Sequence, residues 1–171
     1  ISKSPVFFSV DDTLISKTCK REKIEGISKQ YSHVTGKYEW CHTLVSMQAK
    51  CRNLSLPLDF KIYQTEESCV EKNIKFLSKN DLVIDLLKYI SFSKTNPIYL
   101  LMDSWYSSAK LIMASLKKGI YAITPLKSNR IIYPDGIGIN IKSFAKSIDK
   151  KDLNLVDCQP FFRQFFLGHY F

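Results

Sequence analysis

The arrangement that most constrains the fold is a strand, a helix and a second strand that follow one another along the chain. An apolar run from Ile98 to Met102 favours a buried strand, and apolar residues at helical spacing begin after Ser107 or Ser108, a suitable N-cap. Basic residues followed by Gly119 are typical of a helix end, and the run from Ile120 to Pro125 favours another strand. Two strands joined through a helix are normally parallel, with a right-handed crossover. The sequence therefore predicts an α/β fold.

Three further segments are predicted to be strands. The run from Pro5 to Val10 is rich in β-branched and aromatic residues. Trp40 to Ala49 and Leu56 to Tyr63 are separated by a short connection, so we expect them to pair in antiparallel fashion. The polar, lysine-rich stretch from Ser16 to Lys37 is predicted to cross the surface as a long excursion.

Helical spacing recurs in two other places. Asn80 is a candidate N-cap for an amphipathic helix that ends at about Ser91. A turn-rich β segment is expected to precede a short helix from Ile141 to Ile148. The pattern after Asp152 favours neither strand nor helix.

The charge of the chain limits its partners. The 171 residues include 25 Lys and Arg against 16 Asp and Glu, for a formal charge of +9. Such an excess points to a polyanion, nucleic acid above all, and lysine-rich sequences suit contact with backbone phosphates. No apolar run is long enough to span a membrane, and the 5 cysteines include no Cys-x-x-Cys pair. We therefore expect a cytoplasmic protein in a reducing compartment, with no membrane partner.

Two aspartates carry most of the chemical information. Asp12 and Asp103 each follow a predicted central strand, where α/β sheets present their ligand sites. Strand alternation places Asp12 on the face of Phe8 and Val10, with Asp11 on the opposite face. Two neighbouring carboxylates repel unless a cation lies between them, and Mg²⁺ or Mn²⁺ suits such oxygen donors. An aspartate at a strand end is also a common turn former, so the pattern alone leaves both roles open.

The residues around these aspartates resemble DDE transposases encoded by bacterial insertion sequences. The run from Val10 to Thr13, with Lys17 after it, resembles the first catalytic block of that family, and Met102 to Ser108 resembles the second. Leu126 to Arg130, later in the chain, resembles the last part of that second block. The resemblance covers about residues 6 to 145.

This resemblance implies an RNase H-like fold, a mixed sheet flanked by helices. In it, three carboxylates bind two Mg²⁺ or Mn²⁺ ions and carry out DNA strand cleavage and transfer at transposon ends. Asp12 and Asp103 match the first and second of these catalytic, metal-binding acids. The resemblance also implies transposon ends and target DNA as partners, a homodimer in the complete protein, and association with the nucleoid. The residues expected close to DNA are Lys17, Lys127, Asn129 and Arg130.

The third acid of the family is a glutamate on a later helix, and no glutamate follows Glu71. The chain is therefore expected to be a fragment whose C-terminal part is incomplete and which is inactive by itself. Its predicted domains are a partial catalytic core, 1–150, and the start of a β-rich insertion or a truncated tail, 151–171.

Two alternatives remain from the sequence. The first is another RNase H-like nuclease, which would need its further acids among Asp135, Asp149, Asp152 and Asp157. The second is a non-enzymatic basic module that only binds nucleic acid. A zinc site built from His33, Cys41 and His42 is disfavoured because the spacing lacks a paired knuckle.

Overall fold

The computed structural model describes residues 4–18, 24–91, 96–149, 151, 153–158 and 162–167. The chain forms two compact units, residues 1–125 and residues 126–171. Within the described ranges, none of the helices combines the length and the apolar character needed to cross a bilayer.

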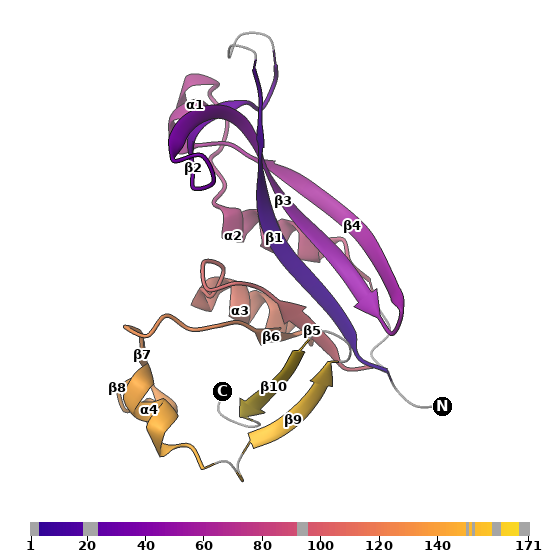
Figure 1. Ribbon diagram of the computed structural model, residues 1–171, viewed down its shortest axis with the longest axis vertical. Coiled ribbons are helices and arrows are strands. Elements are labelled where there is room, and N and C mark those ends of the chain that lie inside the picture. Colours follow the sequence, from indigo (N-terminus) through magenta and orange to yellow (C-terminus); the bar gives the residue numbers. More distant parts are fainter. Residues whose placement is uncertain are drawn as a thin grey trace. The chain divides into compact units, whose positions relative to one another are not determined.

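The first unit is built on a six-stranded mixed sheet (Figure 1). Its strands follow the order β2-β3-β1-β5-β6, and β4 also pairs with β3. Strands β2, β1 and β4 are antiparallel to β3, whereas β5 and β6 run parallel to β1. The bounds are β1 (Val6–Ser16), β2 (Ser28–Ser32), β3 (Lys37–Cys51), β4 (Leu54–Tyr63), β5 (Ile98–Leu101) and β6 (Tyr121–Ile123).

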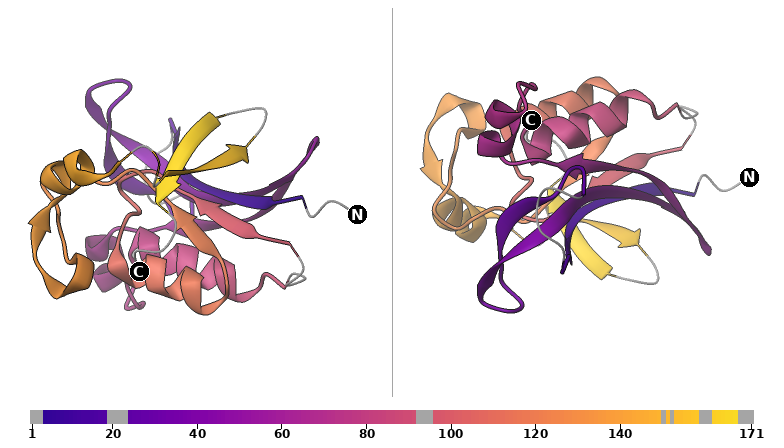
Figure 2. Two further views of the ribbon diagram at one scale, coloured as in Figure 1. Left: turned by 90° about the horizontal axis from the view of Figure 1, so that it is seen from below. Right: turned by 90° about the horizontal axis from the view of Figure 1, so that it is seen from above.

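Helices cover one face of this sheet (Figure 2). They are α1 (Glu66–Glu71), α2 (Lys79–Lys88) and α3 (Ala109–Lys117). The apolar stripe of α2 packs into a core with the inward residues of the central strands, which include Val10, Val45 and Leu100. The predicted α/β fold, a mixed sheet flanked by helices, is confirmed. The parallel pairing of β5 with β6 and the Ser108 cap of α3 are confirmed as well.

The first strand is longer than its sequence indicated, which corrects the expectation that Asp11 and Asp12 follow its end. β1 continues to Ser16 because the long antiparallel β3 pairs with it as far as the register Ser16↔Cys41. On its other side β1 pairs with β5 only as far as Ser9↔Leu101. Asp12 therefore lies inside a strand, yet beyond the point where the parallel ladder stops.

Two other expectations are wrong. The lysine-rich stretch is not only a surface excursion, because it contains β2 and buries Ile27 and Ser28. The N-cap of α2 is Ser78 rather than Asn80. The Ser78 hydroxyl accepts from the Asp81 N–H while the Asp81 carboxylate accepts from the Ser78 N–H, so a capping box fixes the helix start two residues earlier.

In its described residues, the second unit contains two small antiparallel strand pairs, one α-helix and a short 3-10 helix (Pro134–Gly136). The expected short helix is present as α4, and the segment that the sequence left ambiguous forms β9 and β10. The division at residue 150 stays a prediction. The bounds are β7 (Ile131–Ile132), β8 (Ile139–Asn140), α4 (Ile141–Ser147), β9 (Leu153–Cys158) and β10 (Phe162–Leu167).

Candidate active site

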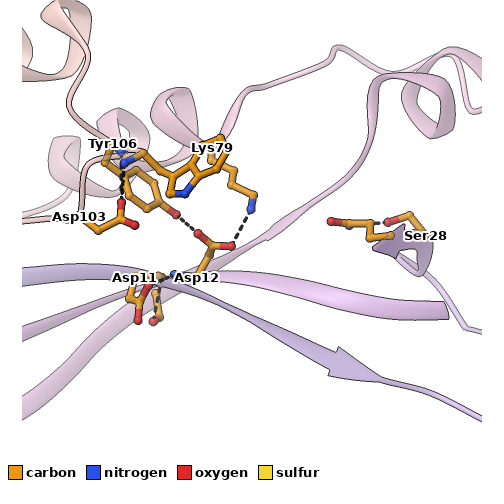
Figure 3. A network of polar contacts seen from close by, with 9 residues as sticks. Asp11, Asp12, Ser28, Lys79, Asp103 and Tyr106 are labelled. Carbon is orange, nitrogen blue, oxygen red and sulfur yellow. Dashed lines mark hydrogen bonds and ion pairs between the residues drawn. The ribbon is translucent and has the colours of Figure 1, made fainter. Parts of the chain in front are cut away.

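Asp12 projects from β1 toward the helices (Figure 3). The alternation of the strand buries Phe8 and Val10 on this face and leaves Asp12 half-buried beside them. Asp11 lies on the opposite side of the strand and is exposed, where its Oδ1 accepts the Asp12 backbone N–H at 2.8 Å. The predicted assignment of the two aspartates to opposite faces is confirmed.

Both carboxylate oxygens of Asp12 have partners from distant parts of the chain. The Tyr106 hydroxyl donates to Oδ1 at 2.8 Å, and the Lys79 ammonium pairs with Oδ2 at 2.6 Å. Tyr106 follows β5, and Lys79 is the first residue of α2. The position of Asp12 is therefore set by elements packed on the sheet and not by its own strand alone.

Tyr106 is a fixed hydrogen-bond donor. Its side chain is only 2% exposed. Burial raises the pKa of this phenol far above its usual value, and the hydrogen bond to Asp12 and the nearby charges of Asp11 and Asp103 raise it further. The hydroxyl consequently keeps its proton throughout the neutral range and always presents it to Asp12.

Asp103 lies two residues after the end of β5. Its Oδ1 accepts the backbone N–H groups of Trp105 at 2.8 Å and of Tyr106 at 3.4 Å, the arrangement of an Asx turn. This turn directs the chain from the strand toward α3. Among the described residues, no hydrogen-bond partner reaches its second oxygen, Oδ2, so that oxygen is available to a ligand. Asp103 is thus a turn former, one of the two roles that the sequence left open. Its Oδ2 remains for the other role, that of a metal ligand.

Tyr106 connects the two carboxylates. Its backbone N–H bonds to Asp103 and its phenol bonds to Asp12. Figure 3 shows Asp12 and Asp103 on the same side of the strands, with the ring of Tyr106 beside both. The two acids that the sequence singled out are thus linked through one residue, Tyr106.

The chemistry of these donors fits a divalent cation such as Mg²⁺. Carboxylate oxygens are its preferred ligands, and Mg²⁺ is commonly held by one or two carboxylates with water and substrate phosphates completing the shell. A cation, the Lys79 ammonium, already lies against Asp12. The part of the chain that the structure describes contains no group of three His, Cys, Asp or Glu side chains able to hold a metal ion. Asp12 and Asp103 would therefore supply two ligands.

The structure does not assign a role to the remaining predicted residues. Lys17 directly follows β1, where its backbone N–H donates to the Trp40 carbonyl. Lys127 and Arg130 belong to the second unit and form a turn in which the Arg130 N–H donates to the Lys127 carbonyl. The DNA-binding roles of these three residues and of Asn129 stay predictions.

Sequence reasoning missed Lys79 altogether. Tyr106 lies in the segment from Met102 to Ser108 that resembles the second catalytic block, but the sequence does not indicate what its hydroxyl contacts. The residues of the disfavoured zinc site have other partners: the Cys41 thiol lies 3.7 Å from the Ser28 carbonyl, and His42 Nε2 lies 2.8 Å from the Glu25 carbonyl.

The chain was compared with known proteins. One similar solved structure is the cryo-EM structure of a piggyBac transposase synaptic complex with hairpin DNA. It is 14% identical, with a TM-score of 0.46, and the match covers 72% of this chain and 23% of that chain. The chain thus spans less than a quarter of the length of that transposase. No curated protein sequence matches significantly. A family model described as DDE superfamily endonuclease matches residues 1–142, most of the sequence, and the chain therefore belongs to this family.

Proposed function

We propose that Asp12 and Asp103 are the first two metal-binding acids of a Mg²⁺- or Mn²⁺-dependent transposase of an insertion sequence, which cleaves and transfers DNA strands at transposon ends. The observation that carries this proposal is the convergence of both carboxylates on Tyr106. Membership of the endonuclease family supports it. Contacts with Tyr106, in addition to the strands that carry them, position both acids.

Each residue of the site has a distinct task. Asp12 Oδ1 accepts the Tyr106 hydroxyl, which orients the carboxylate. Asp103 Oδ1 accepts two backbone N–H groups, which orients this carboxylate as well. A divalent ion, when bound, supplies charge neutralisation at phosphate oxygens and polarises the attacking group. The chain itself supplies pre-set ligands, which avoids the cost of ordering them when the ion arrives.

DNA is the proposed partner of the basic surface. The formal charge of +9 favours a phosphate backbone. Lys17, Lys127, Asn129 and Arg130 are proposed to contact phosphates and so to position the strand without reading its sequence. The complete enzyme is proposed to act as a homodimer on bacterial DNA in the cytoplasm, in association with the nucleoid.

We propose that the 171-residue chain has little or no cleavage activity by itself. Two carboxylates bind a divalent ion weakly, because fewer negative ligands offset the loss of its hydration shell. Purified chain incubated with supercoiled plasmid and Mn²⁺ is expected to leave the plasmid intact. Divalent-dependent nicking that Asp103→Asn abolishes would refute this part of the proposal, while it would support the assignment of Asp103.

Metal binding tests the assignment without requiring activity. Titration of the chain with Mn²⁺, followed by electron paramagnetic resonance of the unbound ion, is expected to detect a site that Asp103→Asn weakens at least tenfold. Asp59→Asn is the matched control, because Asp59 is an exposed sheet aspartate whose Oδ1 also accepts a neighbouring backbone N–H, that of Phe60. An unchanged affinity in Asp103→Asn would overturn the proposed site.

Measuring metal binding together with DNA binding separates an enzyme from a simple binding module. Both are expected to bind duplex DNA with an affinity that falls steeply with salt. A module without a metal site would show this dependence in the absence of any Mn²⁺ binding that relies on Asp12 or Asp103. That combination of results would favour the non-enzymatic alternative.

A further inference from the structure

Lys79 forms an unusually placed ion pair. It is the first residue of α2, directly after the Ser78 cap, and its ammonium lies 2.6 Å from Asp12 Oδ2. The two side chains are 36% and 23% exposed, respectively, so water screens the pair only in part. The sequence separation of 67 residues means that the contact exists only in the folded chain.

The start of a helix is an unfavourable place for the Lys79 ammonium. The N-terminal end of a helix carries a partial positive charge, which disfavours a cation in the first turn. The neighbouring acid of that turn, Asp81, is engaged with Ser78 and Lys110. Asp12 and the ring of Tyr63, whose centroid lies 5.4 Å from the ammonium, are the contacts that offset this cost.

A divalent ion at Asp12 and the Lys79 ammonium need the same carboxylate. Oδ1 already accepts the Tyr106 hydroxyl, and Oδ2 is the oxygen that Lys79 covers. Two cations close to one oxygen repel strongly, the more so where burial limits screening. Binding of the ion must therefore displace or loosen the lysine.

We propose that Lys79 is the built-in counter-cation of Asp12 in the metal-free chain, and that it competes with the divalent ion for this carboxylate. This inference rests on the proposed function, since it takes Asp12 to be a metal ligand. Lys79 keeps the Asp12 charge neutralised until the ion arrives, and it sets the ion concentration at which the site fills.

The test is a Mn²⁺ titration of the wild type, Lys79→Met and Lys110→Met, with the unbound ion measured by electron paramagnetic resonance. Lys79→Met is expected to bind Mn²⁺ about three- to fivefold more tightly, the effect that loss of a partly exposed ion pair allows. Lys110→Met is the matched control, because it removes the same charge from the neighbouring helix but from Asp81 instead of Asp12. It is expected to change the affinity less than twofold.

Two further variants make the outcomes separable. Lys79→Arg keeps the charge and is expected to bind Mn²⁺ no more tightly than the wild type. Asp12→Asn is expected to lose the site. If Asp12→Asn loses the site but Lys79→Met leaves the affinity unchanged or lower, the counter-cation proposal is wrong and the proposed function stands. If no variant or wild type shows binding that depends on Asp12, both are wrong.

A measurement on the wild type tests the same proposal even if a variant misfolds. The ammonium signal of Lys79 in ¹⁵N NMR, assigned through its loss in Lys79→Met, is expected to shift when Mg²⁺ is added. The signal of Lys110 should stay in place. A Lys79 signal that does not move while Mg²⁺ perturbs Asp12 would contradict displacement.

Discussion

The two faces of β1 place chemically identical carboxylates in different surroundings. On the face toward the helices, Asp12 is half-buried and both of its oxygens are engaged by side chains of other elements. On the other face, Asp11 is exposed and its Oδ1 accepts the backbone N–H of the next residue. The elements packed on one face, and not the acidic pair itself, give Asp12 its two side-chain partners.

The largest expected effect is on metal affinity. Asp12→Asn is expected to weaken Mn²⁺ binding more than tenfold, because one of two charged ligands becomes neutral. Asp11→Asn, its neighbour on the open face, is expected to change the affinity less than threefold, through the loss of one distant charge. Isothermal titration calorimetry of both variants measures the contrast. Equal losses in the two variants would remove the distinction between the faces.

The next largest effect is on stability. Tyr106→Phe removes the hydroxyl that bonds to Asp12 and keeps the buried ring. The free energy of unfolding is expected to fall by about 1.5 to 3 kcal/mol, the range for a hydrogen bond to a charged group. Urea denaturation measures it, with Tyr133→Phe as the control, since Tyr133 is exposed and its change is expected to be within about 0.5 kcal/mol. A loss no larger than that of the control would mean that the phenol does not hold Asp12.

A smaller effect is expected from loosening the helix that carries Lys79. Ser78→Ala removes the hydroxyl that caps α2 and should cost about 1 kcal/mol of unfolding free energy. Ser55→Ala on the exposed part of β4 is the matched control and is expected to be neutral. Thermal unfolding by circular dichroism compares the two. A neutral Ser78→Ala would show that the capping box does not secure the first turn of α2.

The smallest expected effect is a pH dependence of the unfolding free energy that comes from Asp85 in α2. Lys61, and then Lys88, hold the pKa of Asp85 below its ordinary value of 3.8. A lowered folded-state pKa gives stability that is present above the unfolded value and is lost as the pH falls through the folded value. The wild type is therefore expected to exceed Asp85→Asn by less than about 1 kcal/mol at pH 7, since these pairs are partly exposed.

That difference should shrink as the pH falls from 3.8 through the lowered pKa of folded Asp85, because the carboxyl then becomes protonated in both states. Urea denaturation at pH 7 and pH 3 checks it. A difference that stays constant between the two pH values would show that the ion pairs of Asp85 are not its source.

Local patterns predicted much of the fold and one half of the site. Alternation along β1 identified the face of Asp12, and the helical period after Ser108 predicted α3 with its cap. The residue pattern around Asp103 predicted its place at the end of β5. These features depend on neighbours in sequence, which is why a single sequence reveals them.

The remainder depends on contacts between distant residues. The length of β1 is set by pairing with β3, and the partners of Asp12 lie 67 and 94 residues away. Nothing in the run from Ser78 to Asp81 distinguishes Lys79 from any surface lysine. The burial of Ile27 follows from the pairing of β2 with β3. The lysine-rich composition of this stretch does not predict that pairing.

The most direct test of the metal site is a crystal structure of the chain grown with Mn²⁺, with an anomalous difference map collected near the manganese absorption edge. An anomalous peak in contact with carboxylate oxygens of both Asp12 and Asp103 is the predicted result. A peak on the opposite face at Asp11, or Mn²⁺ bound elsewhere with none at Asp12 and Asp103, would contradict the assignment.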